Sequence, residues 1–192
     1  MTGTMAIGNG RRGNGLRPWI WGAAACLLLL PALAMRFFPD SGVNWTAADF
    51  IVMGLLLALA CGLYELGAWI SGNVAYRMGF GLAALTAFLT LWVNLAVGML
   101  GSENDGINLM FAGVLLVAAV GGLLAAFKPA GMSRAMVAAG IAQLLAVGVG
   151  LAMGEFQPLE LALTGLFALP WFASALLFRK AARDQARNAA HT

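Results

Sequence analysis

Hydrophobic residues along this chain fall into six blocks, separated by short stretches that hold polar and turn-forming residues. The blocks cover residues 18–35, 49–70, 79–100, 107–127, 134–153 and 159–178. Each is near the length of about 20 residues that a helix needs to cross a hydrocarbon core about 30 Å thick. The pattern predicts an all-α polytopic membrane protein, and its short connections favour an up-and-down bundle of six transmembrane helices. Pro170 predicts a kink in the sixth helix.

Composition agrees, since 61% of the 192 residues are hydrophobic and 10% are charged. In soluble domains, roughly 45–50% of residues are apolar and roughly 25% are charged. We expect a disordered cytoplasmic tail over residues 1–17, one six-helix domain over 18–178 and a basic cytoplasmic tail over 179–192. The apolar run before Ala34 has the outline of a signal peptide, but it is long for one and five further blocks follow it. An uncleaved first helix is therefore the favoured interpretation.

Lys and Arg predict the orientation of the helices. In the predicted threading, ten of these residues lie on one side of the membrane, and only Arg36 lies on the other. The positive-inside rule then places both the N-terminus and the C-terminus in the cytoplasm. The net charge of +3 is explained by this topology and by contact with lipid headgroups, so the expected partner is the bilayer and no nucleic acid is expected.

Glu65 is the one carboxylate predicted to lie within a membrane span. Ala58, Cys61 and Gly62 share its helical face, which predicts that this face points into the bundle. A buried ionisable residue is a candidate functional site. Glu65 also lies near the cytoplasmic end of its helix, so a structural ion pair or hydrogen bond is favoured over a proton or substrate site. The candidate partners are Arg77, Lys128, Arg134 and Arg179.

Two amide side chains are predicted to lie inside the bundle. Asn94 forms a stripe with Gly98 and Gly101 at i, i+4 and i+7, a spacing suited to close helix packing with one hydrogen bond across it. Gln143 lies near the middle of the fifth block, and we expect it to be the partner of Asn94. Both residues are more typical of helix packing than of ligand binding.

The turn Ser102-Glu103-Asn104-Asp105-Gly106 is the most acidic connection. Its carboxylates are candidates to hold a cation, but the spacing is not that of a calcium loop. A solvated hairpin with Asp105-Gly106 as turn residues is favoured. No metal-binding residues are predicted elsewhere.

The chain resembles a group of small, uncharacterised bacterial inner-membrane proteins that carry a WVNLAVG…GSE-N…NLM signature, and the similarity extends from the second hydrophobic block to the basic end of the sixth. Here the signature reads Trp92 to Gly98, then Gly101 to Asn104, then Asn108 to Met110. In that group a proline commonly follows the asparagine of the turn, where this chain has Asp105. The resemblance implies an inner-membrane location and no activity. It marks as candidates Trp92, Asn94, Gly98, Gly101, Ser102, Glu103 and Asn108.

No catalytic, nucleotide or cofactor motif is present in the sequence, and the single histidine is His191. The favoured function is a non-enzymatic accessory or assembly component that binds a membrane protein partner or a second copy of the chain. The alternative is a small transporter or channel acting as an oligomer, with Asn94, Gln143 and Glu65 along its path. An intramembrane enzyme is least favoured, because only Glu65 or Glu103 is available as a base. No catalytic residue and no cofactor are predicted.

Overall fold

The computed structural model describes residues 15–190, and all regular structure in that range is helical. The helices are α1 (Arg17–Phe37), α2 (Ala47–Ile70), α3 (Val74–Ala96), α4 (Leu109–Leu124), α5 (Pro129–Met153), α6 (Pro158–Leu166) and α7 (Ala168–Ala190). Short 3-10 turns at Pro39–Ser41 and Gly106–Asn108 precede α2 and α4. Six described segments are long and apolar enough to cross a membrane, with α6 and α7 forming one of them. The six-helix prediction is confirmed. Of the tail predicted over residues 1–17, residues 1–14 lie outside the described residues, as does His191, and Arg17 is the first residue of α1.

Helix α3 lies closer to the N-terminus of the chain than predicted. It begins after Asn73, whose side-chain oxygen accepts a hydrogen bond from the backbone N–H of Tyr76 at 3.0 Å. It ends at Ala96, because Gly98 has a φ of 81°, a left-handed conformation in which a helix cannot continue. Gly98 and Gly101 therefore lie in a loop, and the predicted stripe with Asn94 on one helix is wrong.

The connection between α4 and α5 differs from the prediction as well. Helix α4 ends at Leu124, since Ala126 and Phe127 have φ values of 46° and 56°. Helix α5 begins at Pro129, five residues before the predicted block 134–153. Proline is favoured at that position because the first helical N–H has no partner within the helix.

The sixth span is broken, as Pro170 predicted. Helix α6 ends at Leu166, and α7 begins at Ala168. Pro170 has no N–H to donate to the carbonyl of Leu166, so the regular hydrogen-bond ladder is interrupted at this point. Helix α7 then continues to Ala190, so residues 179–190 extend the sixth helix where a separate tail was predicted.

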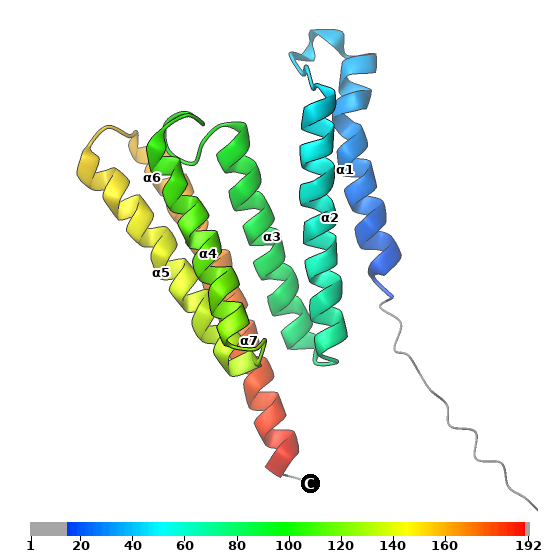
Figure 1. Ribbon diagram of the computed structural model, residues 1–192, viewed down its shortest axis with the longest axis vertical. Coiled ribbons are helices and arrows are strands. Elements are labelled where there is room, and N and C mark those ends of the chain that lie inside the picture. The colour runs from blue at the N-terminus through cyan, green and yellow to red at the C-terminus, as the bar shows by residue number, and fades with distance from the viewer. Residues whose placement is uncertain (1–14, 191–192) are drawn as a thin grey trace, which may run out of the picture.

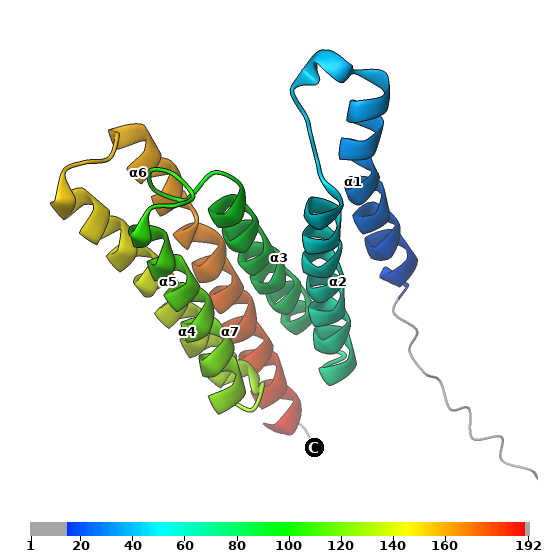
Figure 2. The same cartoon turned by 45° about the horizontal axis from the view of Figure 1, so that its top comes forward.

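The helices pack in the order α4, α5, α7, α3, α2, α1, with each contacting the next. Consecutive helices α3 and α4 therefore touch only lightly, because α7 and α5 stand between them in this order. Figure 1 and Figure 2 show the α1–α2 hairpin at the edge of the bundle, joined to it along α3. The main packing unit is formed by α3, α4, α5 and α7.

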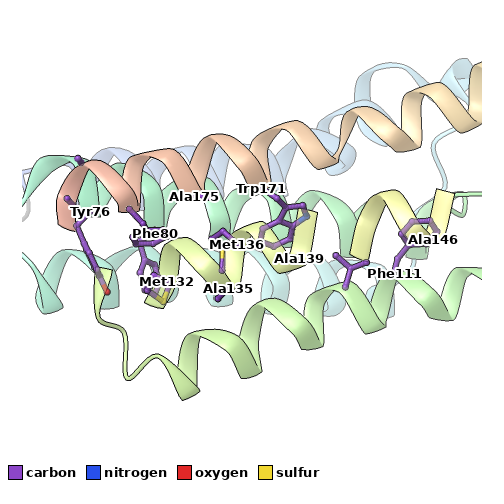
Figure 3. Close-up of a cluster of buried hydrophobic side chains, with 14 of the residues drawn as sticks. Tyr76, Phe80, Phe111, Met132, Ala135, Met136, Ala139, Ala146, Trp171 and Ala175 are labelled. Carbon is purple, nitrogen blue, oxygen red and sulfur yellow. The ribbon is translucent and has the colours of Figure 1, made fainter. Parts of the chain in front are cut away.

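Most side chains of the main buried cluster lie between these four helices (Figure 3). Tyr76, Phe80 and Phe178 form an aromatic cluster, in which the rings of Tyr76 and Phe178 meet edge to face at 5.1 Å between centroids. The Tyr76 hydroxyl donates to the carbonyl of Phe127 at 2.8 Å. Trp171 is buried at the centre of the same interface. In contrast, α1 contains no buried residue, so it contributes little to the core.

The two described ends of the chain lie at the same pole of the bundle (Figure 1). We call this end the basic pole, because the α2–α3 and α4–α5 connections and the C-terminal turns of α7 bring most of the Lys and Arg residues there. The opposite end, formed by residues 38–46, 97–108 and 154–157, is the acidic pole. Arg36 is the only described Lys or Arg near the acidic pole.

Candidate functional site

Asn108 organises the loop at the acidic pole. Its side chain is 4% exposed, and its Oδ1 accepts from the backbone N–H groups of Met99 and Leu100 at 2.9 and 3.1 Å. Its Nδ2 donates to the carbonyls of Leu100 and Ser102 at 3.0 and 2.7 Å. All of the amide's hydrogen-bonding capacity is therefore used to hold residues 99–102 in place. This predicted candidate residue has a structural role.

Two residues of α6 hold the same loop from the other side. Glu160 accepts a hydrogen bond from the backbone N–H of Gly101, and its other oxygen accepts from Gln157 in a capping box that starts α6. The buried Thr164 hydroxyl donates to the carbonyl of Met99 at 2.5 Å. The start of the sixth span is thus fixed to the α3–α4 connection.

Asn94 and Gln143 do not pair, so the predicted bond between them is wrong. Asn94 donates to the backbone carbonyl of Asn108 at 3.2 Å, at the start of α4. Gln143 is fully buried and donates to the carbonyl of Thr164 at 3.0 Å, at the end of α6. Each amide donates to a backbone carbonyl near a helix end, and the Thr164 carbonyl also accepts from the backbone N–H of Phe167 at 3.3 Å.

Four buried polar atoms have no hydrogen-bond partner among the described residues: Thr90 Oγ1, Asn94 Oδ1, Gln143 Oε1 and Trp171 Nε1. They come from the three helices α3, α5 and α7. Ser174 of α7 donates to the carbonyl of Gly79 of α3 at 2.7 Å, which sets the register of this antiparallel pair. About three helical turns beyond Gly79, Thr90 lies near the level of the α6–α7 break. Buried polar groups usually form hydrogen bonds. These four atoms therefore mark the part of the core in which hydrogen-bonding capacity is left unused.

The acidic turn is exposed and is closed by its own residues. Asp105 Oδ2 accepts from the backbone N–H of Ser102 at 2.6 Å, and the Asp105 N–H donates to the Ser102 carbonyl at 3.0 Å. Glu103 accepts only from the side chain of Asn104, at 3.1 Å. The solvated turn is confirmed, but it runs over residues 102–105, and Gly106 begins the next 3-10 turn. Within residues 15–190 no three His, Cys, Asp or Glu side chains form a group that could hold a metal.

Glu65 lies at the basic pole and faces α1. Its Oε1 is 2.8 Å from Nε of Arg17, and it accepts from Nε1 of Trp21 at 2.6 Å. Glu65 therefore forms an ion pair, but the partner is not one of the four predicted residues. The small-residue face that carries Glu65 packs toward α1 at the edge of the bundle, and the carboxylate remains 30% exposed. Cys26 of α1 and Cys61 of this face are free thiols.

Trp92 points away from the polar network toward α2. Its ring lies 5.7 Å from that of Trp45 and stacks on Phe88 at 6.5 Å between centroids. A cavity of about 420 Å³ opens beside these rings between α2 and α3. Its lining is formed by Trp45, Asp49, Val52, Leu56, Trp92, Leu95 and Ala96. We call it the head cavity.

A second cavity of about 260 Å³ lies further down the same seam, between α1, α2 and α3. Leu57, Cys61 and Tyr64 of α2 line it together with Ala84, Leu85 and Phe88 of α3. We call it the tail cavity, because almost all of its lining is apolar. Phe88 lines this cavity and stacks on Trp92 of the head cavity, so the two spaces follow one seam.

No family model, no curated protein and no solved structure matches this chain. The site is therefore interpreted from its own geometry. The structure brings Asn94, Ser102, Asn108 and Gln143 into one region at the acidic pole, whereas Trp92 faces the α2–α3 seam and Glu65 lies at the basic pole.

Sequence reasoning missed the roles of Glu160, Thr164 and Arg17. The pairing of Gln157 with Glu160 three residues later is a capping-box signal that was available in the sequence. No comparable signal marks Thr164 or Arg17, since their partners lie far along the chain. The grouping of Asp49 with two indoles likewise depends on how α2 and α3 meet.

Proposed function

We propose that the protein is a non-enzymatic accessory or assembly component of a bacterial inner membrane, with both termini in the cytoplasm. The excess of Lys and Arg at the basic pole supports this orientation through the positive-inside rule. The resemblance of residues 92–110 to small bacterial inner-membrane proteins supports the location.

The observation that carries the proposal is the position of the α1–α2 hairpin. Helix α1 is 21 residues long and has no buried residue, and it contacts mainly α2. Helices associate in a membrane through close packing, since lipid is as apolar as the helices themselves. A helix that adds almost no packing to its own bundle is available to pack against another membrane component.

The polar side chains of the bundle support a structural role over chemistry. Asn108 and Thr164 bond to backbone atoms of the α3–α4 connection, and Gln143 bonds to a backbone carbonyl near the end of α6. Glu65, one of the two residues considered as a base, is held by Arg17 and Trp21. These side chains stabilise the fold, which leaves few polar groups available for catalysis.

The test combines native mass spectrometry in a mild detergent with cross-linking in native membranes. Cys26 is exposed on α1, so a Cys61→Ala variant keeps one thiol on the proposed docking helix. The matched control is Cys26→Ser, Cys61→Ala, Gly148→Cys, which places the only thiol on α5 at a position with open space around it. We expect a defined oligomer or a stoichiometric partner that cross-links through Cys26 and not through Gly148→Cys. A bare monomer without cross-links would overturn the proposal.

A small transporter is the second candidate, and the broken sixth span favours it. Many transporters bind their substrates where a helix is interrupted within the membrane. Here Thr90, Gln143 and Trp171 carry unpaired buried polar atoms on the helices around the α6–α7 break. Glu65 lies at the basic pole, which removes it from such a path. Solute flux into liposomes that Gln143→Leu abolishes and Glu65→Gln preserves would favour transport; no flux, or flux insensitive to Gln143→Leu, would count against it.

A further inference from the structure

The head cavity combines one carboxylate with two indole rings near the acidic pole of the bundle. Asp49 caps α2 through a single oxygen, since Thr46 donates its backbone N–H and its hydroxyl to Oδ2 at 2.7 and 2.8 Å. The other oxygen, Oδ1, has no hydrogen-bond partner among the described residues, and Asp49 forms no ion pair with them. The cavity therefore offers an exposed carboxylate whose position is set by the cap and whose Oδ1 is free to accept a hydrogen bond.

The indoles that share this cavity are held in place by other aromatic rings. Trp45 meets Phe50 edge to face at 5.2 Å and lies 5.7 Å from Trp92, at an angle of 45° between the two indole planes. Trp92 stacks on Phe88. Indole faces attract organic cations, and the attraction adds to that of a carboxylate in the same cavity. The charge and the rings together fit an ammonium group.

The seam below the head cavity fits a hydrocarbon chain. Gly81, Leu85, Phe88, Trp92 and Leu95 lie on one face of α3, because they recur at spacings of three and four. From Leu95 to Leu85 the helix advances about 15 Å, which is about half of the hydrocarbon core and the depth of one leaflet. An acyl chain whose headgroup occupies the head cavity therefore ends at the tail cavity, where the lining is apolar.

We infer that the α2–α3 seam binds a phospholipid with a primary ammonium headgroup, phosphatidylethanolamine. The ammonium lies between Asp49 Oδ1 and the indole faces, and one acyl chain follows the seam. A primary ammonium fits better than a quaternary one, because only the former can donate a hydrogen bond to the free carboxylate oxygen. The backbone N–H of Trp45 donates to Met35 Sδ at 3.2 Å. Arg36 follows Met35 and is the only basic residue near this pole among residues 15–190, which makes it the candidate to face the phosphate.

The test is native mass spectrometry of the purified full-length protein with equal concentrations of phosphatidylethanolamine and phosphatidylglycerol, which has no ammonium group. We expect the former to occupy the protein about tenfold more, as a cation–π and carboxylate contact of about 1.4 kcal/mol implies. Asp49→Asn keeps the shape and much of the cap but removes the charge, so the preference should disappear. Glu103→Gln removes an acidic side chain at the same pole but outside the cavity, so this variant should retain the preference for phosphatidylethanolamine.

Trp92→Leu provides a second variant that leaves the α2 cap intact, and Trp19→Leu is its control, since Trp19 is 76% exposed and lies at the opposite pole. The inference is supported if Asp49→Asn and Trp92→Leu lose the preference for phosphatidylethanolamine while the control variants Glu103→Gln and Trp19→Leu keep it. Equal binding of both lipids, or a preference that survives Asp49→Asn, overturns it. A second protein chain that cross-links through Leu95→Cys in place of lipid would also overturn it. None of these outcomes depends on the assembly role, which is tested through Cys26.

Discussion

Replacing Asn108 with alanine tests whether the acidic-pole loop depends on one side chain. The change removes four hydrogen bonds, to Met99, Leu100 and Ser102. The N–H groups of Met99 and Leu100 then lack partners, and these residues are only 4% and 0% exposed. Each buried group left unsatisfied costs about 1–3 kcal/mol. We expect the free energy of unfolding to fall by about 3 kcal/mol, after partial relaxation of the loop.

The assay is unfolding in mixed micelles, combined with hydrogen exchange at the two amides. Asn104→Ala is the matched control, because the Asn104 side chain bonds only to the exposed Glu103 and should cost less than about 0.5 kcal/mol. Faster exchange at Met99 and Leu100 in Asn108→Ala would show that this amide protects them. If both variants unfold alike and the two amides stay protected, Asn108 does not hold the loop and the reasoning is wrong.

Three further predictions concern packing, charge and orientation. Gly140→Ala should lower the free energy of unfolding by about 1–3 kcal/mol, because its new Cβ would lie 2.8 Å from an α7 phenylalanine ring. Gly148→Ala is the control, since open space surrounds this position, and it should be neutral or stabilising in the same unfolding assay. Glu65→Gln should change stability by less than about 1 kcal/mol, since its arginine partner is 66% exposed; a larger loss would mean that the pair is better shielded than its exposure indicates. In a cysteine-free background, Ser102→Cys should react with an impermeant maleimide in intact cells and Ser71→Cys only after permeabilisation; the reverse pattern would invert the proposed orientation.

The number and approximate place of the spans were predictable, but several helix ends were not. A span depends on about 20 consecutive apolar residues, which is a local property of the sequence. Helix ends depend on caps and on single backbone conformations. Asn73 starts α3 early and Gly98 stops it, while hydropathy continues unchanged through Met99 and Leu100.

The hydrogen-bond and ion-pair partners of the polar residues were even harder to predict from the sequence than the helix ends. The sequence indicated that Glu65 forms an ion pair and that Asn94 hydrogen-bonds across helices, and both statements hold. It did not identify Arg17 or the backbone of Asn108 as the partners. That choice depends on the rotation of each helix about its axis and on which helices become neighbours.

The sequence by itself determined that this chain forms six apolar helices and that its basic residues gather at one end, because length, hydropathy and charge act segment by segment. The tertiary structure alone decided that α1 stands at the edge and that Trp45, Asp49 and Trp92 share one cavity. Side chains from separate helices meet only after the packing order is set. In a membrane that order depends on close contact between helix surfaces, since hydrophobicity no longer distinguishes a neighbouring helix from lipid.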